Sequence, residues 1–288
     1  MRIKKFRSNE YIRAGGVWVR NFTLNKVKPL GISHMYSNDE HHIVISNENQ
    51  NRVHSNIADE KLEFNRAVII SDGHNFRWKH LLISKLPRDI LVLAVHRAAK
   101  NWKLMSPELP PEHQRPINAL VANNPFPEAM SDMPPMYYPT CVASSRTYYP
   151  FLKKYPGNVF VYEPIPEDEF GTEKAEKYFI DDYRNPICAA IGLAYRFGVT
   201  DLMLISCDYA FPQEKEFAEE LPNGLWSYPQ QLQAQEIIDA NLHWFANRED
   251  EDREIRVADW SDGAKYANAT YISSEEEALS FFPEEGTS

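Results

Sequence analysis

Five consecutive residues that could bind a phosphorylated ligand follow one apolar run: Ser71, Asp72, Gly73, His74 and Asn75. A glycine lets a ligand approach the backbone closely, and the free amides at the start of a helix attract phosphate oxygens. The segment does not match the G-x-G-x-x-G pattern of dinucleotide-binding loops. A tight turn in which Asn75 caps a following helix explains the same residues. The sequence leaves both interpretations open.

Asp208 is the second candidate, because it comes shortly after the apolar run at residues 202–205. A carboxylate in this position could coordinate Mg²⁺, accept a hydrogen bond from a ribose hydroxyl or act as a base. A helix cap or a turn would also use an aspartate there. We predict Asp208 as the catalytic residue, and Asp72 together with Asp208 as the ligands of Mg²⁺.

Other polar residues follow apolar runs in the same way. Asn123, Ser144 and Ser145 could hydrogen-bond a nucleotide, although residues of these types also form ordinary turns. Arg97 and Arg146 lie beside two of these runs and could balance the charge of a phosphate, or could be surface residues. We therefore include the asparagine and the two serines among the predicted ligand-binding residues.

A glycine-bearing loop near the carboxyl end is a further candidate ligand wall. Residues 259–265 read DWSDGAK and follow an apolar run, and Gly263 is the residue that we predict to approach the ligand. A plain turn is the alternative. Of the nine histidines, only His74 and His96 follow predicted strands.

The elements that must position these residues are short apolar runs separated by helical patterns. The runs occupy residues 67–70, 90–95, 117–122, 140–143, 158–162, 202–205 and 255–257. Runs without polar alternation are typical of strands buried on both faces. Helices are predicted from Phe76 to the stop at Pro87, and over 148–155, 185–197 and 229–245.

This alternation predicts an α/β fold, a Rossmann-like and mostly parallel sheet with helices on both faces. In such a sheet ligands bind beyond the carboxyl ends of the strands. We expect residues 1–65 to form a small β-rich cap or edge, with strands at 17–19 and 42–45. Residues 66–272 would form the Rossmann-like nucleotide-binding domain, and residues 273–288 an acidic tail. The proline-rich segment 107–139 would supply the acceptor side of a site.

Composition and charge exclude several classes of function. The chain has 288 residues with 31 basic and 41 acidic side chains, a net charge of −10, which argues against binding duplex nucleic acid or an anionic membrane. No apolar stretch is long enough to span a membrane. Residues 1–11 are basic without a following apolar segment, so we expect no secretory signal. The 3 cysteines lack C-x-x-C spacing, which favours reduced thiols, a cytoplasmic location and no zinc site.

Three segments together resemble a known family. Residues 67–75 (AVIISDGHN) are similar to its first strand and loop, VIIxGNGPS. Residues 185–211 (NPICAAIGLAYRFGVTDLMLISCDYAF) are similar to its helix followed by the strand IxLxGxDxxF, and residues 259–266 (DWSDGAKY) to its loop xTxGGAxI. The family comprises the 6-hydroxymethylpterin diphosphokinase-like proteins and the motility accessory factors. Small bacterial sialyltransferases are its more remote relatives.

The resemblance implies a domain that binds a nucleotide or a nucleotide-sugar and transfers a group from it. Residues 72–75 would then hold the nucleotide phosphates, and Asp208 would match the aspartate that follows the family's strand. The general-base histidine of the sialyltransferases has no counterpart here, because residues 225–230 read LWSYPQ. We expect a glycosyltransferase-like enzyme with a nucleotide-activated donor. The alternatives are a Mg²⁺- and ATP-dependent diphosphokinase of the hydroxymethylpterin type and a non-catalytic nucleotide-binding protein.

Overall fold

The computed structural model describes residues 3–6, 9–14, 17–21, 53–56 and 64–282, the last range with gaps at 96, 106–116, 135–138, 145, 165–178, 181, 183–184, 248–253 and 264. The predicted strand at 42–45, together with His96 and Ser145, lies outside the described residues. Everything stated below about the structure concerns the described part of the chain.

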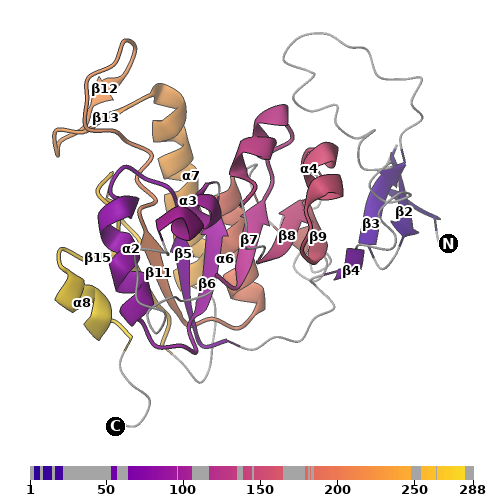
Figure 1. The fold of residues 1–288 in the computed structure, drawn as a ribbon, viewed down its shortest axis with the longest axis horizontal. Coiled ribbons are helices and arrows are strands. Elements are labelled where there is room, and N and C mark those ends of the chain that lie inside the picture. The colour runs from indigo at the N-terminus through magenta and orange to yellow at the C-terminus, as the bar shows by residue number, and fades with distance from the viewer. Residues whose placement is uncertain are drawn as a thin grey trace.

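One large sheet forms the centre of the protein (Figure 1). Its strand order is β10-β9-β8-β7-β6-β5-β11-β14-β15, with β4 also paired to β9, and all pairings within it are parallel. The longer strands are β5 (Arg66–Ile70), β6 (Leu91–Val95), β7 (Ala119–Ala122), β8 (Thr140–Ser144), β9 (Val159–Pro164), β11 (Asp201–Ile205) and β14 (Arg256–Trp260). The predicted parallel sheet is confirmed.

The central strands are mostly apolar because both of their faces are covered. Every residue of β5 is buried, and so is every residue of β6. Successive side chains alternate between the faces. Val68 and Ile70 therefore pack into one hydrophobic cluster, and Ala67 and Ile69 into another on the opposite face.

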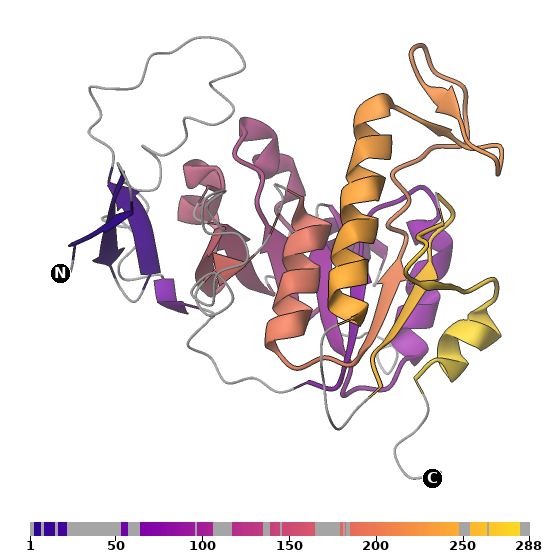
Figure 2. The ribbon, with the colours of Figure 1, turned by 180° about the vertical axis from the view of Figure 1, so that it is seen from behind.

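Helices cover each face of the sheet. The first cluster contains residues of α2 (Phe76–Lys85), α3 (Ala98–Met105), α4 (Tyr149–Lys154), α8 (Glu275–Ser280) and the 3₁₀ helix η6 (Pro127–Asp132). The second cluster contains residues of α6 (Pro186–Arg196) and α7 (Pro229–Ala246). Figure 2 shows these last two helices side by side on their face. The arrangement is a Rossmann-like α/β fold.

Helix α6 has the local signals expected of it. Asn185 Oδ1 accepts a hydrogen bond from the amide of Ile187 at 2.8 Å, and Pro186 occupies the first helical position. Gly198, with φ of +74°, follows the end of the helix in the left-handed region. Asn185 and Pro186 thus mark the start of the helix, and Gly198 marks its end shortly before β11 begins at Asp201.

The two ends of the chain add smaller elements. Strands β1 (Ile3–Phe6), β2 (Asn9–Ala14) and β3 (Val17–Asn21) form a separate antiparallel sheet, while β4 (Val53–Asn56) extends the main sheet beside β9. The expected acidic tail begins instead with helix α8, whose Ala278 is buried in the core together with the following Phe282. The structure also has short strands β10 (Phe179–Ile180) and β15 (Thr270–Tyr271) in the main sheet.

An arm projects from the body between β11 and α7 (Figure 1). It carries the hairpin of β12 (Glu219–Glu220) and β13 (Trp226–Ser227). Within the described residues, no helix combines the length and the apolar character needed to cross a bilayer.

Candidate functional site

The candidate site lies where the order of the strands reverses. From β5 the chain builds β6 to β9 on one side, then returns to place β11 on the other side of β5. The helices that follow these two neighbouring strands, α2 and α7, lie on opposite faces of the sheet. The loops therefore diverge at the carboxyl ends of β5 and β11, which is where open α/β sheets bind ligands. We call this junction the β5–β11 seam.

Backbone pairing continues past the ends of the two strands at the seam. The amide of Ser71 donates to the carbonyl of Ile205 at 3.0 Å, and the amide of Gly73 donates to the carbonyl of Ser206 at 3.0 Å. Ser206 and Tyr209 have φ values of +55° and +46°, a region that non-glycine residues seldom adopt. This backbone turns sharply and holds Asp208 between them.

A cavity of about 500 Å³ opens at the seam. It is lined by loop residues after β5, β6, β7 and β11, by η6, and by the first turn of α7: Ser71, Asp72, Gly73, His74, Arg97, Asn124, Glu128, Ser131, Asp132, Ser206, Asp208, Tyr209, Ala210 and Gln231. Its volume is within the range of small-molecule sites, about 300–1,000 Å³. The predicted residues that it brings together are Ser71, Asp72, Gly73, His74 and Asp208.

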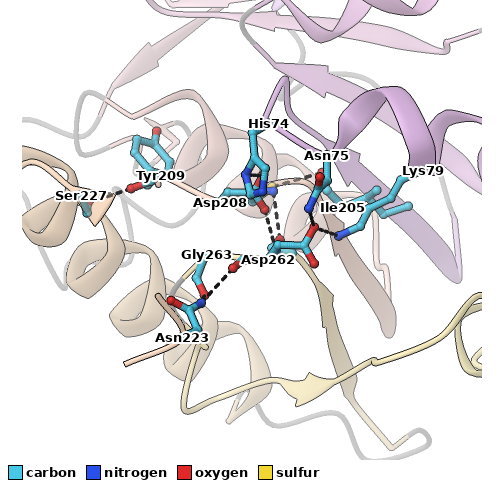
Figure 3. Close-up of polar contacts among 12 residues, drawn as sticks. His74, Asn75, Lys79, Ile205, Asp208, Tyr209, Asn223, Ser227, Asp262 and Gly263 are labelled. Atoms are coloured by element: carbon cyan, nitrogen blue, oxygen red, sulfur yellow. Dashed lines mark hydrogen bonds and ion pairs between the residues drawn. The ribbon is translucent and has the colours of Figure 1, made fainter. Parts of the chain in front are cut away.

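Figure 3 shows the Asp208 carboxylate between the imidazole of His74 and the loop that carries Asp262. The Asp208 side chain is fully buried, and Oδ1 accepts a hydrogen bond from the amide of Asp262 at 2.6 Å. Oδ2 lies 3.3 Å from Nδ1 of His74, and neither of these two atoms has a hydrogen bond of standard geometry to the described residues. The contact is an ion pair when the imidazole is protonated.

His74 is held in an acidic environment. The pKa of its imidazole is raised above the ordinary value of 6.5, chiefly because Asp208 lies beside Nδ1. Burial opposes this shift, Asp262 adds to it, and the nearby ammonium of Lys79 works against it. About 20% of the side chain is exposed, at the wall of the cavity. A histidine of this kind can gain or lose a proton near neutral pH.

The two glycines predicted to approach a ligand both lie against Asp208. A Cβ at Gly73 would be 2.0 Å from Oδ2 of Asp208 and 2.4 Å from the carbonyl oxygen of Ser206. A Cβ at Gly263 would be 1.8 Å from the carbonyl oxygen of Asp208. Close packing of the three loops therefore explains both glycines. Gly73 also lines the cavity, whereas Gly263 is not among its lining residues.

Asn75 is not among the residues that line the cavity and belongs to a second group of polar contacts, with Asp262 and Lys79. Its side-chain amide donates to Oδ2 of Asp262, the same oxygen that lies 2.8 Å from Nζ of Lys79. Lys79 is buried in α2 and also donates to the carbonyl oxygen of Trp260 at 2.8 Å. Burial of Asp262 acts to raise its pKa, but the hydrogen bonds from Lys79 and Asn75 outweigh it and lower the pKa. Asn75 thus uses its side chain to tie α2 to the loop after β14.

Two of the remaining predicted residues, Asn123 and Ser144, lie away from the main cavity. Asn123 is buried beside a separate small pocket of about 20 Å³ at the end of β7. Ser144 is fully buried, and its hydroxyl accepts a hydrogen bond from the amide of Arg146 at 3.2 Å, as a turn residue does. Arg97 does line the cavity, where Nε lies 3.5 Å from Oδ1 of Asp132.

Sequence reasoning missed three residues of η6 and one of α7 that line the cavity: Glu128, Ser131, Asp132 and Gln231. No motif marks them. The one sequence feature that points to them is the proline-rich segment 107–139, which we expected to supply the acceptor side of a ligand site. The structure brings its 3₁₀ helix to the cavity.

The cavity wall carries four carboxylates, Asp72, Glu128, Asp132 and Asp208, against one guanidinium and one histidine. No three described side chains of His, Cys, Asp or Glu gather closely enough to hold a metal ion by themselves. Mg²⁺ is commonly held by one or two carboxylates together with substrate phosphates. The buried Oδ2 of Asp208 has no hydrogen-bond donor of standard geometry among the described residues, and Asp72 lines the same cavity, so the donor set fits Mg²⁺ that arrives with a nucleotide.

Comparison with known proteins supports the fold. No family model and no curated protein matches the chain. Among solved structures, the MAf glycosyltransferase from Magnetospirillum magneticum AMB-1 is similar, with a TM-score of 0.58 and 12% sequence identity. The match covers 75% of this chain and 35% of that chain, so this chain spans about a third of its length. At this identity the shared property is the fold, and the chain has the α/β fold found within that glycosyltransferase.

Proposed function

We propose that the protein is a transferase that uses a nucleotide-activated sugar, with the nucleotide bound in the cavity at the β5–β11 seam. The observation that carries the proposal is the cavity itself, in which a buried carboxylate and a histidine from two neighbouring strand ends meet. The structural similarity to a glycosyltransferase supports the choice among transferases.

The backbone before α2 offers a place for phosphate groups. The amide of Gly73 is already used by the carbonyl of Ser206, but the amides of His74 and Asn75 make no hydrogen bond to the described residues. Free amides before a helix of 10 residues attract anionic oxygens. The nucleotide phosphates would therefore lie against residues 74–75.

The acidic lining determines what must accompany the phosphates. Four carboxylates would repel a nucleotide diphosphate unless a cation lies between them, and Mg²⁺ held by Asp72 and Asp208 would supply that charge. Protonated His74 and Arg97 would add to it. We expect nucleotide binding to be stronger with Mg²⁺ than without it.

A thermal-shift panel tests this proposal. CMP, UDP, GDP, ATP and the corresponding nucleotide-sugars would be measured with and without Mg²⁺, because a ligand that binds only the native state stabilises it, by about 2.7 kcal/mol at a hundredfold excess over Kd. Arg97→Ala, in the cavity wall, should weaken the shift. Arg146→Ala removes the same charge outside the cavity and serves as the control. Absence of a shift with every nucleotide would overturn the proposal.

The acidic lining also favours one alternative. Two carboxylates on the wall of a nucleotide site are what a Mg²⁺- and ATP-dependent diphosphokinase requires. Stabilisation by ATP with Mg²⁺, and none by nucleotide-sugars, would select this alternative. Binding of either ligand without turnover would instead indicate a nucleotide-binding protein.

A further inference from the structure

The loop that follows β11 uses all of its hydrogen-bond acceptors within the protein. The five consecutive carbonyl groups of residues 205–209 each accept a hydrogen bond. Two amides of the loop after β5 donate to the first two carbonyls at 3.0 Å, and the hydroxyl of Tyr266 donates to the third at 2.8 Å. The side-chain amide of Gln235 donates to the last two at 3.3 and 3.1 Å. Figure 3 shows Ser227 beside Tyr209, whose carbonyl accepts its hydroxyl at 2.8 Å.

The backbone donors of the same loop are left without partners. The amides of Asp208, Tyr209 and Ala210 make no hydrogen bond to the described residues. Amides inside a folded protein are rarely left unpaired. The three residues that carry them all line the cavity at the β5–β11 seam. A ligand in this cavity would therefore meet a loop whose donors are free and whose acceptors are occupied.

Ser206 adds a side-chain donor to this loop. The residue has no exposed surface and lines the cavity, and its Oγ has no hydrogen-bond partner among the described residues. Its φ of +55° is one that glycine adopts with less strain. An unpaired buried hydroxyl and a strained backbone both act against stability. A contact with a bound ligand would give the serine a use at this position.

Free donors of this kind suit an anionic oxygen. Successive backbone N–H groups in a turn bind anions, and a hydroxyl can add a further hydrogen bond. The carboxylates elsewhere on the cavity wall only accept hydrogen bonds when ionised, so they offer an anion no donor. The loop at residues 206–210 therefore supplies donors that the acidic part of the wall lacks.

The loops after β5 and β11 supply donors on two sides of one cavity. The proposed function already places nucleotide phosphates against the free amides of residues 74–75. Strands β5 and β11 are neighbours in a parallel sheet, so their backbones lie about 4.8 Å apart. A diphosphate is long enough to contact both loops at once. A single phosphate would leave one set of donors unpaired.

We propose that the loop at residues 206–210 binds the second phosphate of a nucleoside diphosphate, through the hydroxyl of Ser206 and the amides of residues 208–210. This inference rests on the proposed function and narrows it: the donor is a nucleoside diphosphate sugar and not a nucleoside monophosphate sugar. The carboxylate of Asp208 belongs to the same loop, so the contact needs the cation that also screens the first phosphate.

The first test compares nucleotides that differ by one phosphate. CMP and CDP, UMP and UDP, and GMP and GDP would be titrated into the wild type in the presence of Mg²⁺ and followed by calorimetry. For the base that binds best, the diphosphate should bind at least about tenfold more tightly, because it makes additional charge-assisted hydrogen bonds. Equal affinity of the two would overturn this inference and leave the proposed function standing.

Substitutions of Ser206 separate this contact from the general attraction between charges. Ser206→Ala removes the hydroxyl, and Ser206→Gly also relieves the strain of the positive φ. Both variants should bind the diphosphate about tenfold to a hundredfold more weakly, with little change for the monophosphate. Ser206→Gly should nevertheless melt at the same temperature as the wild type or higher. Weaker binding by a variant that is no less stable cannot come from unfolding.

Phe217→Gly is the matched control. Phe217 also has a positive φ, +66°, but lies in the arm, is 82% exposed and is not among the residues that line the cavity. Its replacement relieves the same kind of strain and should leave both affinities unchanged.

The outcomes separate this inference from the proposed function. Unchanged diphosphate affinity in both Ser206 variants would overturn the role of the loop. An equal loss for monophosphate and diphosphate would overturn it too, because Ser206 would then contact a part that the two ligands share. If the wild type binds no nucleotide in either form, the proposed function fails and this inference fails with it.

Discussion

At the scale of single residues, Gly73 is a position where the packing of the site leaves no room for a side chain. Its α-carbon packs directly on Asp208 and Ser206, so even the methyl group of Gly73→Ala would overlap two oxygens. We expect a loss of about 1–3 kcal/mol in the free energy of unfolding, the usual cost of overpacking. Urea denaturation would measure it. A lower nucleotide affinity in a variant with a larger side chain at position 73 would therefore reflect disturbed packing as well as a lost ligand contact.

Gly224 provides the matched control for this substitution. Nothing lies within 4 Å of a Cβ at Gly224, but its φ is +76°. Its cost is therefore conformational, and asparagine, which tolerates the left-handed region, should restore part of the stability lost in alanine. At Gly73 the cost is steric, so asparagine should be worse than alanine there. Equal tolerance of asparagine at both positions would contradict this distinction.

A second prediction at this scale concerns the carboxyl group of Asp259 in β14. Burial raises its pKa to about 7, although nearby Ser261 acts in the opposite direction. The group is neutral in the folded protein and ionised in the unfolded chain between about pH 4 and pH 7. Unfolding therefore releases a proton in this window, and the stability contributed by the neutral form is lost as the pH rises through it.

Asp259→Asn removes this dependence. Relative to the wild type, the variant should gain about 3 kcal/mol in unfolding free energy between pH 5 and pH 8, since each pKa unit corresponds to about 1.4 kcal/mol. Urea denaturation at the two pH values measures the difference. Glu236→Gln, which changes an exposed carboxylate on α7, should show no such gain. A pH-independent difference between Asp259→Asn and the wild type would refute the prediction.

At the scale of elements, Lys79 joins α2 to the end of β14. Its buried ammonium donates to the carbonyl of Trp260, pairs with Asp262 and lies 5.1 Å from the centre of the Trp260 ring. Lys79→Met should fill the same space but leave a buried carbonyl and a carboxylate without their donor. We expect a loss of about 2–4 kcal/mol in unfolding free energy.

A double-mutant cycle with Asp262→Asn measures the part of this loss that belongs to the ion pair. A coupling energy of about 1 kcal/mol or more is expected, since the two groups are in direct contact and partly shielded from water. Lys85, whose ammonium pairs with Glu275 at the surface, is the comparison: Lys85→Met should change stability little. Equal effects of the two substitutions would show that burial of Lys79 adds nothing.

The same elements show what could be predicted from sequence. Seven apolar runs predicted the longer strands. A strand that is buried on both faces has a continuous apolar sequence, which can be recognised without knowing which strands pair with it. Helix α6 was predicted from Asn185, Pro186 and Gly198, which act locally. Helix α3 was not predicted, and the contact between Asn75 and Asp262 could not be, since these two residues are separated by 187 positions. Local rules contain no information about such pairs.

The site was predicted in part for the same reason. The positions after β5 and β11 followed from the rule for open sheets, which correctly places Ser71–His74 and Asp208 at one cavity. Which side chains reach the cavity depends on packing of the whole chain. Asn123 is buried beside the separate small pocket, although the next residue, Asn124, lines the cavity, and Ser144 ends strand β8 farther along the sheet. The roles of these residues toward a ligand stay predictions.

At the scale of the whole molecule, the three cysteines can show whether the two faces of the sheet unfold together. Cys141 in β8, Cys188 in α6 and Cys207 after β11 are buried free thiols, the first packed on one face of the sheet and the other two on the opposite face. Burial raises the pKa of Cys141 and of Cys207, so neither forms a thiolate while folded. Reaction with a thiol reagent therefore requires opening of the structure.

If both faces of the sheet unfold together, the three thiols should become reactive over the same range of urea concentration. Single-cysteine variants, with the other two replaced by alanine, would assign each rate. Titration in concentrated guanidinium, where all three thiols must react, is the control. Reaction of Cys188 at lower urea than Cys141 would show that the α6–α7 layer separates from the sheet before the rest unfolds.

The pairing of β5 with β11 also has a consequence for how the chain is made. Arg66 pairs with Asp201, so the two strands that form the seam are separated by more than a hundred residues of chain. Contacts this distant in sequence form late, because a long loop must close before they contribute. A nascent chain that ends before residue 201 therefore presents one edge of β5 unpaired, and an unpaired apolar edge is a template for aggregation. During synthesis, the backbone edge that later supports the cavity is thus open to wrong pairing until β11 has been made.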